Sequence, residues 1–133
     1  MKKILAILTL STLTGCNTLG ADKPAIIASM TREIGRTRPA DCPHKWCACY
    51  LDKKLAAHGH KKRGSHRARD FASYGRATGA HRGAIMVQPH HVGIVTGICS
   101  DGRIEAISGS HSRRVGIGCY RRSTIIAFRK ISD

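Results

Sequence analysis

The chain has 133 residues, a formal net charge of +15 at pH 7 and few aromatic side chains. This length allows one domain with one hydrophobic core, and it excludes a multidomain arrangement. The excess of positive charge indicates an anionic partner or surface, which is nucleic acid inside a cell but cell-wall polymer or lipid headgroups outside it.

The first residues predict export rather than a structural element. Two lysines precede an apolar run over residues 4–13, which is short for a membrane span and typical of a signal peptide. The run ends in Leu-Thr-Gly-Cys at positions 13–16, which resembles the lipobox of bacterial lipoproteins. An ordinary signal peptide followed by a chance cysteine is the alternative. We expect a signal peptide over 1–15, acylation of Cys16, a tether over 16–23 and a domain over 24–133. Removal of the signal peptide with Lys2 and Lys3 lowers the net charge of the chain from +15 to +13.

Two helices are predicted in the first half of the domain. Apolar side chains at positions 26, 27, 30 and 34 share one face of a helix that Gly35 ends. A second helix is expected from position 43 or 44 to about position 58, with Cys47 at the start of its buried face and Asp52 pointing away. A basic stretch over 58–69, expected as solvated surface, leads into a short helix over 68–74.

After Gly83 the hydrophobic pattern changes period. Short segments rich in Ile and Val predict an antiparallel sheet of about five strands. Helices followed by a sheet define an α+β domain. The predicted strands cover residues 84–87, 91–97, 103–108, 115–119 and 124–129.

The cysteine count leaves one thiol unpaired. Export permits disulfides, and five cysteines remain if Cys16 is acylated. Cys99 can bridge to Cys119, and Cys42 can bridge to Cys49, although the sequence does not fix either pairing. Both pairings leave Cys47 free.

A free cysteine at a helix start is a candidate nucleophile. A thiol hydrolase needs a thiolate, a base within hydrogen-bond reach and a polar group that orients the base. The positive end of the helix dipole favours a thiolate at Cys47. A small core residue or a disulfide partner is the structural alternative for this cysteine.

His91 is the candidate base because it opens a predicted strand. Strand alternation places His91, Gly93 and Val95 on one face, and His91 would lie against the start of the second helix if that face packs there. Ser108, Ser110 and His111 are candidates for the orienting group. We expect His111 to take this role, because a neutral imidazole can accept a hydrogen bond from His91.

Several short motifs together resemble one superfamily. Trp46-Cys47-Ala48, Gly83-Ala84-Ile85 and the segment from His91 to Val95 are similar to the NlpC/P60 and CHAP cysteine peptidases, especially a small single-domain NlpC/P60-like branch. The resemblance covers about residues 24–130. It implies a papain-like fold, with helices packed on the small sheet, and hydrolysis of amide bonds in peptidoglycan or in related γ-glutamyl and glutathionyl substrates.

The resemblance also implies roles for individual residues. It makes Cys47 the nucleophile and His91 the base, and it implies no cofactor. The third position of this branch lies in Gly-Asn-His or Gly-Asn-Gln, whereas this chain has Gly109-Ser110-His111. Since Ser110 replaces the Asn, the third residue departs from the pattern, and superfamily members that use His there favour His111.

These observations predict a peptidoglycan amide hydrolase, either an endopeptidase or an amidase. We expect a monomer that is lipid-anchored at the periplasmic face of a bacterial membrane, with the outer membrane favoured. A basic wall-binding lipoprotein with a degenerate triad on the same fold is the alternative.

Two further partners are disfavoured. A zinc site built from Cys47-x-Cys49 and His58-x-His60 has narrower spacing than structural zinc sites usually show. Nucleic-acid binding lacks support because the basic stretch carries no interleaved aromatic side chains for base stacking.

Overall fold

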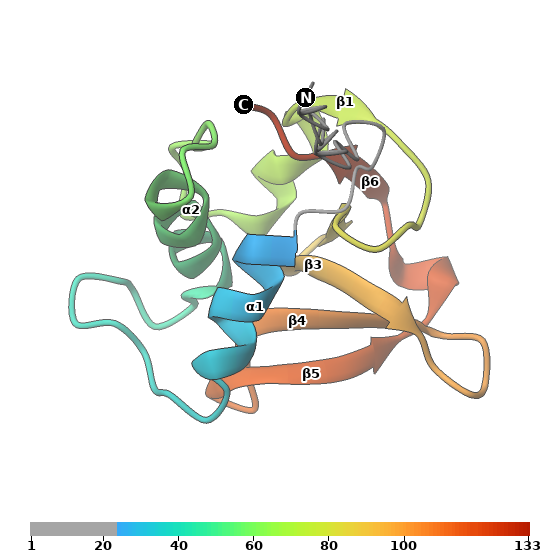
Figure 1. Cartoon of the computed structure of the whole chain (residues 1–133), viewed down its shortest axis with the longest axis horizontal. Helices are drawn as coiled ribbons and strands as arrows, with labels where there is room; N and C mark the ends of the chain where they lie inside the picture. The colour runs from blue at the N-terminus through green and yellow to red at the C-terminus, as the bar shows by residue number, and fades with distance from the viewer. Residues whose placement is uncertain (1–23) are drawn as a thin grey trace, which may run out of the picture.

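A computed structural model describes residues 24–133, in which both α-helices precede the strands of the sheet (Figure 1). The expected signal peptide, the tether and Cys16 lie outside the described residues. The helices are α1 (Pro24–Arg32), α2 (Cys47–Ala57) and the 3-10 helices η1 (Ala68–Ser73) and η2 (Arg122–Thr124). The strands are β1 (Arg76–Ala77), β2 (Ile85–Gln88), β3 (His91–Ile98), β4 (Ile104–His111), β5 (Arg114–Tyr120) and β6 (Ala127–Lys130).

The strands form one sheet in the order β1-β6-β2-β3-β4-β5, and every neighbouring pair is antiparallel. The predicted α+β class is therefore confirmed, and each of the five predicted strands is present. The prediction missed β1, because two residues are too few to show an alternating pattern. None of the helices in the described residues is long and apolar enough to span a bilayer.

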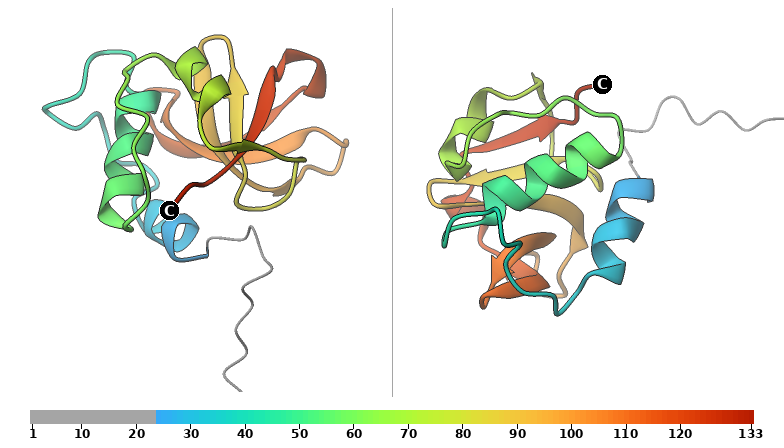
Figure 2. Two further views of the ribbon diagram at one scale, coloured as in Figure 1. Left: turned by 90° about the horizontal axis from the view of Figure 1, so that it is seen from above. Right: turned by 90° about the vertical axis from the view of Figure 1, so that its left-hand side faces the viewer.

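The main core lies between the helices and one face of the sheet (Figure 2). Side chains of α1, α2 and η1 pack there against alternate strand residues, including Val92 and Ile94 of β3. The opposite face carries a smaller cluster that includes Val95. Hence the β3 face that packs against α2 is the one with Val92 and Ile94, and the face shared by His91 and Val95 points away from the main core. Val92 and Ile94 are buried in the main core, and their burial sets which face of β3 points toward the helices.

Both predicted helices begin or end differently from expectation. The first ends at Arg32, and the side chain of Ile34 is 47% exposed, so Ile34 does not belong to the buried face. The second begins at Cys47 rather than at position 43 or 44. A disulfide between Cys42 and Cys49 closes the preceding residues into a loop, which replaces the predicted first turn.

Asp52 is buried, which corrects the expectation that it points into solvent. Its two carboxylate oxygens accept the backbone N–H groups of Arg63 at 2.7 Å and Gly64 at 2.8 Å. A buried carboxylate requires such partners. Asp52 therefore fixes the basic stretch 58–69 against α2, so this stretch is partly anchored rather than wholly solvated.

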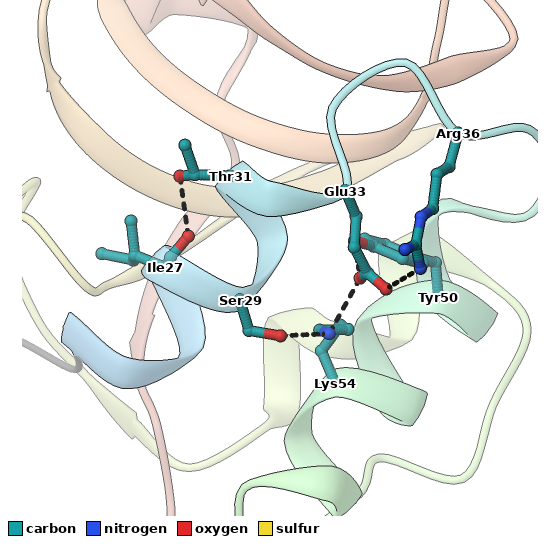
Figure 3. Close-up of polar contacts among 7 residues, drawn as sticks. All are labelled: Ile27, Ser29, Thr31, Glu33, Arg36, Tyr50 and Lys54. Carbon is teal, nitrogen blue, oxygen red and sulfur yellow. Dashed lines mark hydrogen bonds and ion pairs between the residues drawn. The ribbon is translucent and has the colours of Figure 1, made fainter.

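Glu33 connects the end of α1 to α2 (Figure 3). Its Oε1 accepts hydrogen bonds from the hydroxyl of Tyr50 and from Lys54 Nζ, each at 2.8 Å, and its Oε2 lies 2.9 Å from Arg36. Burial would raise the pKa of this carboxyl, but the hydrogen bonds from Lys54 and Tyr50 outweigh it and lower the pKa. Lys54 also bonds Ser29 of α1, so the two helices share one polar cluster.

We predict that Glu33→Gln lowers the free energy of unfolding by about 1–2 kcal/mol, because it weakens charge-assisted hydrogen bonds to largely buried partners. Urea denaturation followed by circular dichroism measures this. Asp41→Asn is the matched control, since it removes the carboxylate of an exposed ion pair with Lys53 and should leave the midpoint unchanged. Equal effects of the two substitutions would contradict a structural role for Glu33.

Candidate active site

The start of α2 is held against the sheet by Trp46. This side chain is 2% exposed and packs edge-on against Tyr50, with ring centroids 5.6 Å apart. It also lies on Gly109 of β4, where an added Cβ would come within 2.7 Å of the indole ring. Only glycine permits this approach, so Gly109 sets how closely the start of α2 can lie to β4.

Two disulfides leave one thiol free. Cys42 is bonded to Cys49, and Cys99 is bonded to Cys119, which are the two pairings that the sequence analysis named as possible. The first disulfide ties the loop before α2 to its first turn. Within residues 24–133, Cys47 is the free cysteine.

Cys47 lies where β3 and β4 separate. Paired residues of these strands begin at Ile94 and Ile107, so the first residues of β3 are not paired with β4. The backbone N–H of Val92 donates a hydrogen bond to the sulfur of Cys47. Burial raises the pKa of the Cys47 thiol, and the backbone N–H groups of Val92, Ala48 and Cys47 itself offset only part of this rise. The resting thiol is therefore protonated at neutral pH.

His91 is the residue before Val92, and its ring nitrogen Nε2 has two oxygen partners. Ser108 Oγ lies 2.8 Å away, and the hydroxyl of Tyr120 lies 3.1 Å away. The rings of His91 and Tyr120 are stacked, with centroids 5.3 Å apart and an interplanar angle of 23°. Burial and then the nearby charge of His111 lower the pKa of His91 to about 4, so this imidazole is neutral at rest.

Ser108, and not His111, contacts the candidate base directly. His111 Nδ1 lies 3.1 Å from the hydroxyl of Tyr120, so His111 reaches His91 through Tyr120. The sequence-based preference for His111 as the direct orienting group is therefore corrected to Ser108, which is 1% exposed. Ser110, the third candidate, makes no hydrogen bond to His91.

The reason lies in the backbone after Ser108. Ser110 has a φ of 58°, and the β4–β5 register shifts between Ser108 and His111. A left-handed residue interrupts strand alternation, which turns the ring of His111 toward β5. There it lies over Gly118, where an added Cβ would come within 2.6 Å of the imidazole.

Tyr120 is the site residue that sequence reasoning missed. It ends β5, and its hydroxyl connects His91, Ser108 and His111, with the Ser108 contact at 3.5 Å. Burial raises the pKa of Tyr120, so its hydroxyl stays protonated. The alternation Gly116-x-Gly118-x-Tyr120 was the available signal, because two glycines before an aromatic residue leave room on one face for a facing ring.

The zinc alternative does not fit these contacts. Cys49 is consumed in a disulfide, so the Cys47-x-Cys49 pair cannot supply two thiolates to a metal. Within residues 24–133, no cluster of three or more His, Cys, Asp or Glu side chains has the geometry to hold a metal ion.

Comparison with known proteins supports the fold. No protein-family model matches the sequence, and no curated protein matches it. Among solved structures, the crystal structure of the P60 domain from the M. avium subspecies paratuberculosis antigen MAP1204 is similar, with a TM-score of 0.54. The identity is 18%, and the match covers 80% of this chain and 90% of that domain. The chain therefore has a P60-like fold.

We predict that His91 titrates with a pKa near 4, measured by the NMR shifts of its ring protons. The unfolded state, with an ordinary pKa near 6.5, then binds more protons between these two values. Stability from this site is complete above about pH 6.5, and about 3 kcal/mol of it is lost as the pH falls toward 4.

His91→Gln is the control, because it should remove this part of the pH dependence and leave the rest. A His91 pKa above 6.5 would contradict the account, since it would indicate a resting thiolate–imidazolium pair.

Proposed function

We propose that this chain is a cysteine hydrolase of the NlpC/P60–CHAP superfamily that cleaves an amide bond in peptidoglycan. One observation carries the proposal. A free cysteine begins a helix and accepts a hydrogen bond from Val92, next to a histidine that is hydrogen-bonded to a buried serine. The P60-like fold supports the same reading.

In the proposed reaction, His91 uses the ring nitrogen that its neighbours leave available. Since Nε2 faces Ser108 and Tyr120, Nδ1 is the nitrogen for the thiol proton of Cys47. The sulfur attacks the amide carbonyl as His91 takes this proton, and the Nε2–H of the resulting imidazolium donates to Ser108 Oγ. A backbone N–H at the start of α2 has no intrahelical acceptor and can stabilise the oxyanion.

The remaining steps return the site to its starting state. His91 gives the proton to the departing amine as the C–N bond breaks, which leaves a thioester on Cys47. A water molecule then attacks the thioester, and His91 accepts its proton. Cys47 regains a proton as the carboxylic acid product leaves. Because both groups are neutral at rest, proton transfer accompanies each attack rather than preceding it.

The first residues and the net charge of the chain support a proposal for where the reaction takes place. We propose that Cys16 is acylated and anchors the domain at the periplasmic face of a bacterial membrane, with the outer membrane favoured. The domain acts there as a monomer, and its charge of +13 after removal of residues 1–15 holds it against the anionic wall.

A wall-binding lipoprotein without activity is the second candidate. The contact of His91 with Ser108 favours this second candidate. A serine hydroxyl stabilises an imidazolium less strongly than a charged or amide partner does. The pKa of His91 near 4 points the same way, because such an imidazole is a weak base.

We predict that the purified domain releases fragments from peptidoglycan and that Cys47→Ala reduces release to background with the fold retained. Mass analysis of the soluble fragments identifies the cleaved bond. Cys99→Ala/Cys119→Ala is a control that removes a disulfide but keeps Cys47. Fragment release by Cys47→Ala at the wild-type rate would exclude Cys47 as the nucleophile.

We predict that Ser108→Ala lowers kcat by about tenfold, the value of one hydrogen bond to the base in the transition state. His111→Ala should cost less than about threefold, since its contact with His91 is indirect. Steady-state kinetics on a soluble wall fragment measures both. A larger loss for His111→Ala than for Ser108→Ala would restore His111 as the orienting residue.

A further inference from the structure

A pocket of about 220 Å³ opens beside Cys47. Its walls come from the residue before Trp46, from the start of η1 with the residues preceding it, and from the turn between β2 and β3. These segments are far apart in sequence, and all of them line the pocket beside the thiol. The lining residues are Lys45, Cys47, His66, Arg67, Ala68, Arg69, Pro89 and His90.

The charge of this lining has one sign. Lys45, Arg67 and Arg69 are cations, His66 and His90 add two imidazoles, and no lining residue is acidic. None of the three cationic side chains forms a hydrogen bond or an ion pair with another residue in 24–133. The pocket lining therefore carries an excess of positive charge beside the sulfur.

Nearby carboxylates are already engaged elsewhere. Asp41 pairs with Lys53 at 2.6 Å, and Asp70 accepts a hydrogen bond from Ser65 at 2.5 Å. Both oxygens of Asp52 accept backbone N–H groups. None of these three acids lines the pocket, and Asp41 interacts electrostatically with His66 at its edge.

Several other arginines of the domain have side-chain partners. Arg36 pairs with Glu33, Arg103 pairs with Asp101, and Arg129 donates to the carbonyl oxygens of Tyr74 and Gly75. These three arginines are held by their partners, whereas the side chains of Arg67 and Arg69 are not held by any described residue. Arg67 and Arg69 flank buried Ala68, which fixes their backbone while leaving both guanidinium groups exposed.

We infer that this pocket is an anion subsite that binds a free carboxylate of the substrate next to the scissile amide. The inference rests on the proposed function and narrows its substrate class to amides that carry such a carboxylate, in preference to their amidated forms. Guanidinium groups suit this ligand because they donate two parallel hydrogen bonds to a carboxylate.

Alkylation of Cys47 tests the subsite without relying on hydrolysis. Iodoacetate and iodoacetamide have similar size and displace the same iodide, but only iodoacetate carries a carboxylate. We expect the iodoacetate-to-iodoacetamide rate ratio, measured at about pH 8 by loss of the free thiol and referred to glutathione, to be raised by about tenfold. Arg67→Gln/Arg69→Gln should return this ratio toward the glutathione value, and the ratio cancels any change that the substitutions cause in the thiolate fraction of Cys47.

The matched control removes the same charge elsewhere. Arg32→Gln/Arg76→Gln replaces two exposed arginines that do not line the pocket, and it should keep the raised ratio. A ratio equal to that of glutathione in the wild type would overturn the subsite. An equal fall in both double variants would also overturn it, because net charge would then explain the preference.

Hydrolysis of paired wall peptides separates this inference from the proposed function. For peptides that differ only in a free or amidated carboxyl, we expect kcat/KM to be at least about tenfold higher for the free acid, and Arg67→Gln/Arg69→Gln to remove this difference mainly through KM. Equal hydrolysis of both peptides by the wild type would overturn the subsite and leave the hydrolase intact. No hydrolysis of either peptide, together with a raised alkylation ratio, would overturn the hydrolase and leave the subsite.

Discussion

The packing of the start of α2 at the point where β3 and β4 separate determines the geometry of the whole site. Trp46 lies directly on Gly109, and the backbone N–H of Val92 bonds the sulfur of Cys47. Together these contacts fix the thiol beside the strand that His91 begins. The Cys42–Cys49 disulfide adds a covalent tie between the first turn of α2 and the loop before it. A larger residue at position 109 would move the helix start and the thiol with it.

Burial then decides the protonation state of the site. It raises the pKa of Cys47 and lowers that of His91, so both groups are neutral at neutral pH. Burial disfavours a charged His91, but the hydroxyls of Ser108 and Tyr120 face its Nε2 and can stabilise a transient imidazolium. His111 contacts the hydroxyl of Tyr120 and reaches His91 only through it. Under the proposed function, this arrangement favours positive charge on His91 only while a substrate is reacting.

Sequence reasoning placed Cys47 near the start of a helix and His91 at the start of a strand, because hydrophobic periodicity locates such elements to within a few residues. It named the two disulfides that form as possible pairings without fixing either one. It ranked His111 above Ser108 because it could not see the left-handed backbone at Ser110, which depends on how β4 pairs with β5. Tyr120 was missed for a similar reason, since its role arises only when β5 folds back along β4. The parts of the site that follow from local sequence patterns could be predicted. The parts that depend on the long-range register of the strands could not.

The central claim is that Cys47 forms a covalent bond with the substrate. Its most direct test is peptide-level mass spectrometry of the domain, quenched in acid while it digests wall fragments. The account predicts a mass increase equal to the acyl fragment on the peptide that contains Cys47, and none after Cys47→Ala. Release of fragments with no adduct on Cys47, or with the adduct on another residue, would contradict it.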